Sequence, residues 1–276
     1  MADVPVRLAD DVDDVIAVLD DVVGWAQDQA SALGYFAVLY RDVTAKVRDG
    51  IDDGFFDDGE RMARLDVVFA NRYLAALDAL RRGAPATQSW QLGFDAASAG
   101  GPIVLQHLLV GISAHINLDL AIAVVEAAGS DGVTALRRDF DRINAILASM
   151  MARSQAALAT ISPWLGALDA FGGRTDDAVV RFSIEVARRQ AWTFATQLGG
   201  LPASEVPGAI TARDVGVVPV GRTVLRPGWL TPVVWIVRLR ESKDVHANLD
   251  ALSVVQPPDL AEVEAIADGR TPLLDP

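Results

Sequence analysis

The chain has 276 residues, of which 51% are hydrophobic, and its formal net charge is −13. This composition predicts a folded protein with a sizeable core, and the negative charge argues against nucleic acids and anionic membrane surfaces as partners. Because there is no cysteine, disulfides, thiolate catalysis and cysteine metal ligands are excluded.

Helical periodicity of apolar residues runs through nearly every long segment and predicts a single all-α, bundle-like domain over residues 1–252. An acidic, loosely attached tail is expected over 253–276. The segment 83–101 is predicted to be a loop. Residues 200–232 are rich in glycine and proline, and Pro219 makes a long regular helix there unexpected, so a covering segment is predicted. The expected helices, in chain order, cover residues 10–29, 32–48, 60–82, 101–127, 131–161, 175–198 and 233–252.

The helix expected at 101–127 is the segment around which the fold is predicted to form. It is almost wholly apolar, and a helix that is apolar nearly all round is central and buried. Pro102 suits a helix start, and Gly129 suits a helix end. Its length would also span a bilayer, but its internal polar residues and the lack of flanking basic residues favour a buried core helix.

Polar residues of this helix follow one another at i+4 steps. His107, Gly111, His115 and Asp119 therefore form one stripe. Buried polar groups need partners, so the stripe either bonds to neighbouring helices as part of the core or lines a cavity. Two histidines and an aspartate on one stripe favour a functional site.

Outside this helix, the strongest candidate is Asp66, which lies beside the apolar stripe of the helix expected at 60–82. We expect Asp66 to converge in space with the polar stripe, since both need buried polar partners. An internal salt bridge of Asp66, with Arg72 as a candidate partner, is the structural alternative. The residues predicted to contact substrate are Arg72, Tyr73, Asn117 and Trp192.

Several segments resemble a mainly bacterial family of uncharacterised proteins, defined only as a domain of unknown function. The resemblance covers most of residues 30–252, and its most specific part is the HLLVGISAHINLDL block. It implies a helical fold and brings no activity with it. The segments that carry it are GYFAVLYRDVT, LDVVFANRYLAAL, LQHLLVGISAHINLDLA, DFDRIN and IVRLRES, and the residues to which it points are Asp66, Arg72, His107, His115 and Asp119.

A fainter similarity links His115 and Asp119 to zinc-dependent phospholipase C and P1-type nucleases, which use His-x-x-x-Asp pairs as metal ligands. The three-metal cluster of those enzymes needs more histidines than the three of this chain, so that cluster is excluded.

Three functions remain open from the sequence. The leading hypothesis is a cofactor-free enzyme that acts on a lipophilic small molecule by cyclisation, isomerisation or elimination, and a cyclase of natural-product biosynthesis is one form of it. His115 or His107 would be its acid–base group, with Asp119 and Asp66 in support. The second is a hydrolase that binds a divalent metal such as zinc through the same four side chains. The third is a binding or scaffold protein with a structural stripe.

The N-terminus shows no secretory signal pattern, so a cytoplasmic location is expected. The expected partner is a small lipophilic substrate, with neither nucleic acid nor membrane, and the sequence does not determine the oligomeric state.

Overall fold

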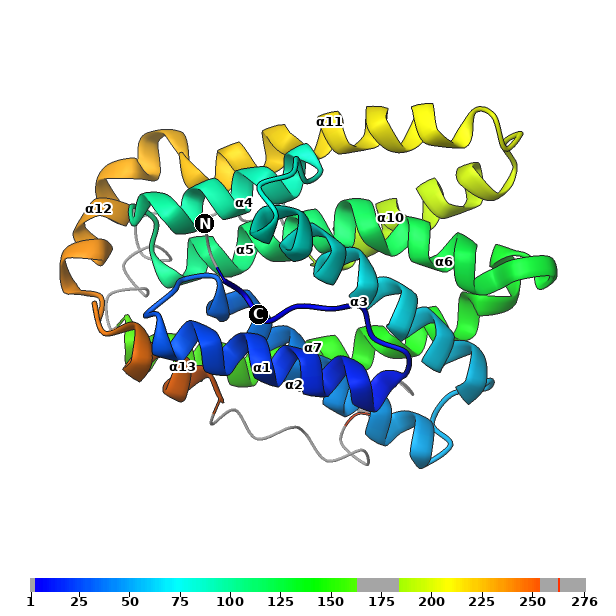
Figure 1. The fold of residues 1–276 in the computed structure, drawn as a ribbon, viewed down its shortest axis with the longest axis horizontal. Coiled ribbons are helices and arrows are strands. Elements are labelled where there is room, and N and C mark those ends of the chain that lie inside the picture. Colours follow the sequence, from blue (N-terminus) through cyan, green and yellow to red (C-terminus); the bar gives the residue numbers. More distant parts are fainter. Residues whose placement is uncertain (1–2, 163–183, 254–262, 264–276) are drawn as a thin grey trace.

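The computed structural model describes residues 3–162, 184–253 and 263 (Figure 1). Every regular element within these residues is a helix, which confirms the all-α prediction. The α-helices, in chain order, are α1 (Val12–Asp28), α2 (Gly34–Asp52), α3 (Gly59–Arg81), α4 (Gln88–Ala99), α5 (Val104–Ala114), α6 (Leu120–Ala128), α7 (Arg137–Ile161), α10 (Ile184–Gly199), α11 (Val206–Leu225), α12 (Thr231–Arg240) and α13 (Val245–Ser253). Of the tail predicted over 253–276, Ser253, which ends α13, and Val263 are described, and the rest lies outside the described residues.

Acidic residues start two of the N-terminal helices. The Asp11 carboxylate accepts a hydrogen bond from the Asp14 backbone N–H at 2.8 Å, and Asp58 accepts one from the Arg61 N–H at 2.9 Å. These N-caps satisfy backbone donors that have no partner inside the helix, so α1 and α3 begin directly after them.

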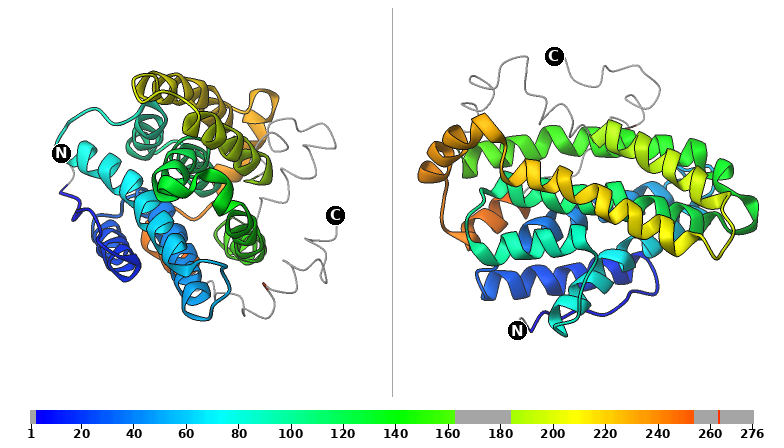
Figure 2. Two further views of the ribbon diagram at one scale, coloured as in Figure 1. Left: turned by 90° about the vertical axis from the view of Figure 1, so that its right-hand side faces the viewer. Right: turned by 90° about the horizontal axis from the view of Figure 1, so that it is seen from above.

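The predicted central segment lies in the middle of the molecule. α5 and α6 contact α2, α3, α4, α10 and α11, and the end-on view in Figure 2 shows these helices around them. All residues from 110 to 124 are buried. The stretch Val104–Asp131 is long and apolar enough to cross a bilayer, but 89% of its most apolar window is buried inside the protein, as in the core helix of a soluble protein.

The central helix predicted for 101–127 runs through from Val104, but it is not α-helical along its whole length. A single π-helical turn, η1 (His115–Asp119), separates α5 from α6, and the Leu120 N–H donates to the His115 carbonyl five residues back. The Asn117 carbonyl in this turn accepts a hydrogen bond from Arg213 Nε of α11 at 2.8 Å. A π turn widens the helix locally and is frequent at functional sites. Here it occurs at His115 and Asp119, the residues predicted to be catalytic.

Two segments predicted to lack long helices are in fact helical. α4 forms within the expected loop at 83–101, and α11 spans much of 200–232 with Pro219 inside it. The side chain of Pro219 is exposed. We attribute its tolerance to solvent, because water can satisfy the backbone carbonyl that loses its donor, and Pro207 favours the first turn of the same helix. α11 packs against α4 and α5, and this packing outweighs the local preference.

The helix expected at 233–252 is instead divided into α12 and α13. Between them, the buried Glu241 carboxylate accepts the Val104 N–H at the start of α5, at 3.2 Å from each oxygen. The helix expected from 131 starts later, at Arg137. The short 3₁₀ turns η2 (Gly129–Asp131) and η3 (Val133–Leu136) precede it, because Gly129 and Gly132 adopt positive φ angles that end the helix.

Candidate functional site

Asp119 is held by three side chains from different parts of the fold. Its Oδ2 accepts a hydrogen bond from Trp90 Nε1 of α4 at 2.7 Å, and it lies 3.3 Å from His115 Nδ1. Its Oδ1 accepts one from Arg72 Nε of α3 at 3.3 Å. Asp119 is only 1% exposed, so these contacts give a buried carboxylate a fixed orientation. Arg72 therefore pairs with Asp119 and not with Asp66.

The His115 imidazole is oriented by this carboxylate. A carboxylate only accepts hydrogen bonds, so Nδ1 carries the hydrogen and Nε2 keeps its lone pair. The ring stacks on Phe69 with centroids 3.5 Å apart, and Tyr40 lies edge-on at 4.5 Å. Burial lowers the pKa of His115, although Asp119 opposes this shift by favouring the cation. His115 is therefore a neutral base at pH 7, and its Nε2 is buried without a hydrogen-bond partner.

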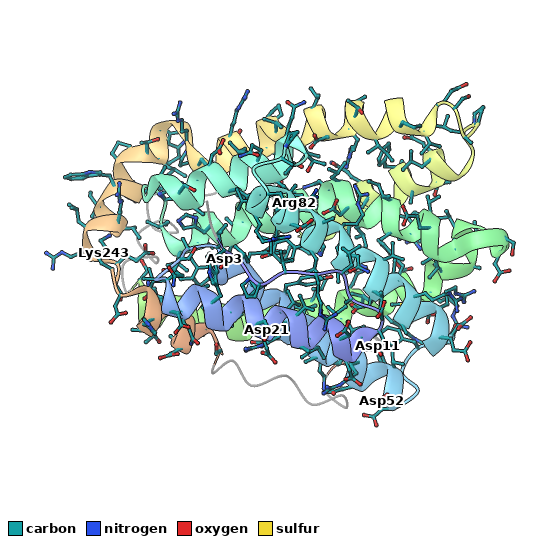
Figure 3. All side chains as sticks on the ribbon, viewed as in Figure 1. Asp3, Asp11, Asp21, Asp52, Arg82 and Lys243 are labelled. Carbon is teal, nitrogen blue, oxygen red and sulfur yellow. The ribbon has the colours of Figure 1, made fainter. Side chains whose placement is uncertain are left out.

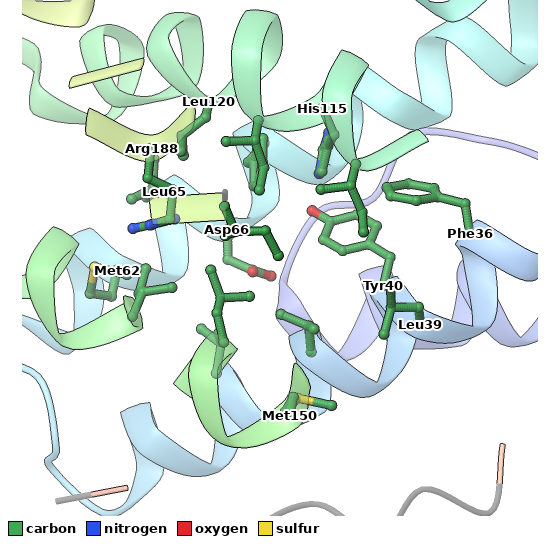
Figure 4. A pocket seen from close by; sticks show the side chains of 18 residues that line it. Phe36, Leu39, Tyr40, Met62, Leu65, Asp66, His115, Leu120, Met150 and Arg188 are labelled. Atoms are coloured by element: carbon green, nitrogen blue, oxygen red, sulfur yellow. The ribbon is translucent and has the colours of Figure 1, made fainter. Parts of the chain in front are cut away.

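His115 lies in the wall of an apolar cavity of about 90 Å³ (Figure 4). Side chains from α2, α3, α5, η1, α6, α7 and α10 line it, and most of them are aliphatic or aromatic. The polar side chains among them are Tyr40, Asp66, His115 and Arg188. Asp66 and His115 thus reach the same cavity from α3 and η1, as the sequence predicted for these two residues.

Asp66 and Tyr40 are also incompletely paired. Asp66 is 6% exposed, its Oδ2 has no hydrogen-bond partner, and no cation of the described residues forms an ion pair with it. Burial raises its pKa to about 7. The Tyr40 hydroxyl is buried and has no partner with good hydrogen-bond geometry. Burial and the neighbouring carboxylates raise its pKa well above 10, and the nearby Thr44 hydroxyl opposes this shift. Three unpaired polar atoms thus belong to the lining of one cavity, whereas buried polar groups are normally satisfied.

Arg188 of α10 reaches the same cavity but has partners. Its Nε donates to Asn144 Oδ1 at 2.5 Å and its Nη2 to the Phe140 carbonyl at 2.7 Å. Burial lowers its pKa, but a guanidinium remains protonated at neutral pH. The cavity therefore has one fixed positive charge in its wall.

Other predicted site residues lie away from the cavity lining. His107 packs against Tyr35 with ring centroids 5.8 Å apart, and burial lowers its pKa to about 4. Asn117 Nδ2 donates to Ser113 at 3.3 Å, and Trp192 packs on Phe140. The four proposed metal ligands are therefore not assembled, and no group of three or more His, Asp or Glu side chains in the described part of the chain is placed to hold a metal ion.

Tyr73 does not line the cavity but packs against aromatic residues next to it. Its buried ring packs against Phe36 and Trp90, both with centroids 4.9 Å away. The sequence pattern does not single out Trp90, because residues 83–101 are predicted to be a loop. It also does not single out Tyr40, although Phe36 and Tyr40 stand at i+4 on the predicted apolar face and both line the cavity.

Comparison with known proteins gives a family and no activity. No curated protein and no solved structure matches the chain. The profile of a family of unknown function, DUF5995, matches residues 12–227, which include the cavity, the π turn and all three partners of Asp119. This span starts earlier than the predicted resemblance and ends before α12 and α13. The chain belongs to the DUF5995 family.

Proposed function

We propose that this protein is an acid–base enzyme that moves a proton to or from carbon in a small, lipophilic carbonyl compound. The observation that carries the proposal is the His115 Nε2 atom, which lines an apolar cavity without a partner while Asp119 holds the other nitrogen of the ring. A carboxylate that orients a histidine in this way leaves it poised to accept a proton from substrate.

Asp66 supplies the complementary group. With a pKa of about 7, a substantial fraction of Asp66 is protonated at neutral pH, whereas the lowered pKa of His115 keeps the imidazole neutral. Environments that separate two titratable groups in this way assign one as base and the other as acid. The raised pKa also lets Asp66 donate a hydrogen bond to a developing enolate oxygen, as the Tyr40 hydroxyl can.

The proposed reaction is an isomerisation. In a β,γ-unsaturated carbonyl compound, His115 Nε2 removes a proton from the carbon between the carbonyl and the double bond. The electron pair moves into the resulting dienolate, whose oxygen Asp66 and Tyr40 stabilise. The imidazolium, stabilised by Asp119, then returns the proton to a different carbon, so the double bond shifts. The step is balanced without an oxidant, a reductant or a second substrate.

The cavity limits the substrate to small apolar molecules, or to the reactive end of a longer one. Its volume of about 90 Å³ is below the roughly 150 Å³ that accommodates benzene in an engineered cavity. Met62 and Met150 lie in the wall, and flexible thioethers allow limited repacking. The largely apolar lining disfavours strongly hydrated substrates.

The experiment uses a β,γ-unsaturated cyclopentenone and its acyclic analogues in D₂O. Absorbance follows formation of the conjugated isomer, and NMR follows deuterium uptake at carbon. We expect both to be catalysed by the wild type and by His107→Gln, a matched change outside the cavity lining, and both to be lost in His115→Gln. Undiminished rates in folded His115→Gln would refute the assignment of the base.

A further inference from the structure

Exposed apolar residues gather at one end of the molecule. Among the residues that the structure describes, six large apolar side chains are exposed, and four of them lie in the 3₁₀ turn η5 (Gly228–Leu230) and in α12, which stands at one end of the fold in Figure 1. Trp229 is 60% and Trp235 58% exposed. Such a concentration on an otherwise polar surface marks an interaction site. The other two members of the four are Ile236 and Leu239.

α12 is poorly covered by the rest of the described chain. Val237 is its one buried residue, and the helix packs chiefly on η5 instead of on the body of the bundle. Trp235, Ile236 and Leu239 follow i, i+1 and i+4 spacing, so they share one side of the helix. Within the described residues, α12 therefore has an apolar face that no other helix covers extensively.

The chain segment that carries this face is basic, although the protein as a whole is acidic. Residues 222–243, here called the tip, contain five of the 24 basic residues of the chain and one acidic residue, Glu241, which is buried against α5. Arg222 and Arg226 are exposed, and neither forms an ion pair with a carboxylate of the described residues. Lys243 extends from the same end of the molecule (Figure 3). The local charge of the tip is thus opposite to that of the whole chain.

We propose that the tip docks on anionic lipid membranes. Tryptophan rings favour the boundary between headgroups and acyl chains, and nearby arginine and lysine side chains bind lipid phosphates. The net charge of −13 would argue against an anionic membrane if the charges were spread evenly over the protein, but the tip carries net positive charge. The Debye length is about 8 Å at physiological salt, so salt largely screens the interaction of the membrane with charges farther away than this. When the tip docks first, its own basic residues therefore dominate the electrostatic interaction with the lipid phosphates.

A second copy of the chain fits this surface less well. A two-fold interface through α12 would place the same basic residues of both copies close together, and like charges there would repel. An anionic lipid surface provides opposite charge and an apolar interior at once. This inference is independent of the proposed proton-transfer activity.

The experiment measures co-sedimentation of the full chain with vesicles of phosphatidylcholine, with and without phosphatidylglycerol, at low and high salt. We expect binding to the anionic vesicles that weakens with salt. Arg222→Gln combined with Arg226→Gln should weaken it by about 30-fold, since each basic residue near the surface contributes a factor of about five. Trp235→Ser should weaken it by about ten-fold or more.

Matched controls are Arg64→Gln on α3 and Leu8→Ser near the N-terminus, which remove an exposed charge and an exposed apolar side chain away from the tip. Both should bind vesicles like the wild type. The proposal is overturned if the wild type does not sediment with anionic vesicles, or if the tip variants bind as the controls do. Self-association that depends on Trp235, without vesicle binding, would overturn it in favour of a second copy.

Discussion

Asp139 and Asp66 are both buried carboxylates, but their surroundings differ in kind. Asp139 of α7 accepts the backbone N–H groups of Asp57 and Asp58 at 2.7 and 3.2 Å, and ties the turn before α3 to α7. Asp66 has a free oxygen and faces a cavity. Burial alone therefore does not distinguish the two carboxylates, and what sets Asp66 apart is an unpaired oxygen beside a cavity.

Asp214 and Glu241 resemble Asp139, because their carboxylates also accept hydrogen bonds from backbone N–H groups. Asp214 accepts the N–H groups of Gln88 and Ser89 at the start of α4, at 2.7 and 3.0 Å, and Glu241 accepts that of Val104 at the start of α5. Each caps a helix from a distant part of the chain. Such capping stabilises the fold. The capping oxygens already accept backbone hydrogen bonds and are therefore not free to bind a substrate.

The largest effect is expected at the base. His115→Gln should lower the catalysed isomerisation by about a thousand-fold, in the range usual for loss of a general base. Far-UV circular dichroism should show unchanged helix content. A comparable loss in His107→Gln would break the distinction between the histidine that lines the cavity and the one that does not.

The next largest effect is on stability at the capping carboxylate. Asp139→Ala should lower the free energy of unfolding by about 3 kcal/mol, because two part-buried backbone N–H groups lose a buried, charged acceptor. Chemical denaturation at pH 7 measures this loss. The isomerisation rate of the folded fraction should stay near the wild-type value, and a strong decrease would show that Asp139 also serves the site.

Asp66→Asn should raise the free energy of unfolding, whereas Asp139→Ala should lower it. The pKa of Asp66 is about 7 in the folded protein and near 3.9 when unfolded, so the folded state holds this proton more tightly. The contribution of Asp66 to the free energy of unfolding of the wild type is fully present below about pH 4. It is lost progressively as the pH rises to the folded-state pKa of about 7. The variant should therefore unfold like the wild type at pH 4 and be more stable by about 2–4 kcal/mol at pH 8.5.

Equal stability of the two proteins across this pH range would show that Asp66 finds a partner when ionised. The isomerisation catalysed by the wild type should also fall above pH 7, since Asp66 then loses the proton that it donates. The pH profile of Asp66→Asn should lack this decline.

The smallest effect is expected at His107. It is partly buried beside Tyr35, and its lowered pKa keeps it neutral at pH 7. His107→Gln should change the free energy of unfolding by less than about 1 kcal/mol at pH 7.5, as for substitutions that break no paired buried group. Thermal unfolding checks this, and a larger loss would indicate that the imidazole has a structural role.

Much of the fold follows from sequence pattern. The apolar periodicity around Leu65 and Leu77 predicts α3, and the uncharged stretch around His107 and His115 predicts a central buried helix, because these signals lie within single helices. The i+4 spacing of His115 and Asp119 likewise predicts their contact, and the structure places them 3.3 Å apart. Local geometry is sufficient for each of these conclusions.

Only the tertiary structure determines which residues from other helices surround His115 and Asp119. Trp90 reaches Asp119 only because α4 packs on α5, and α11 remains helical through Pro219 because it packs on α4 and α5. The separation of His107 from the cavity and the arrival of Tyr40 and Asp66 at His115 depend on how helices cross, which no local periodicity encodes. The residue types of the site are therefore visible in the sequence, whereas their membership in one cavity is a property of the packed fold.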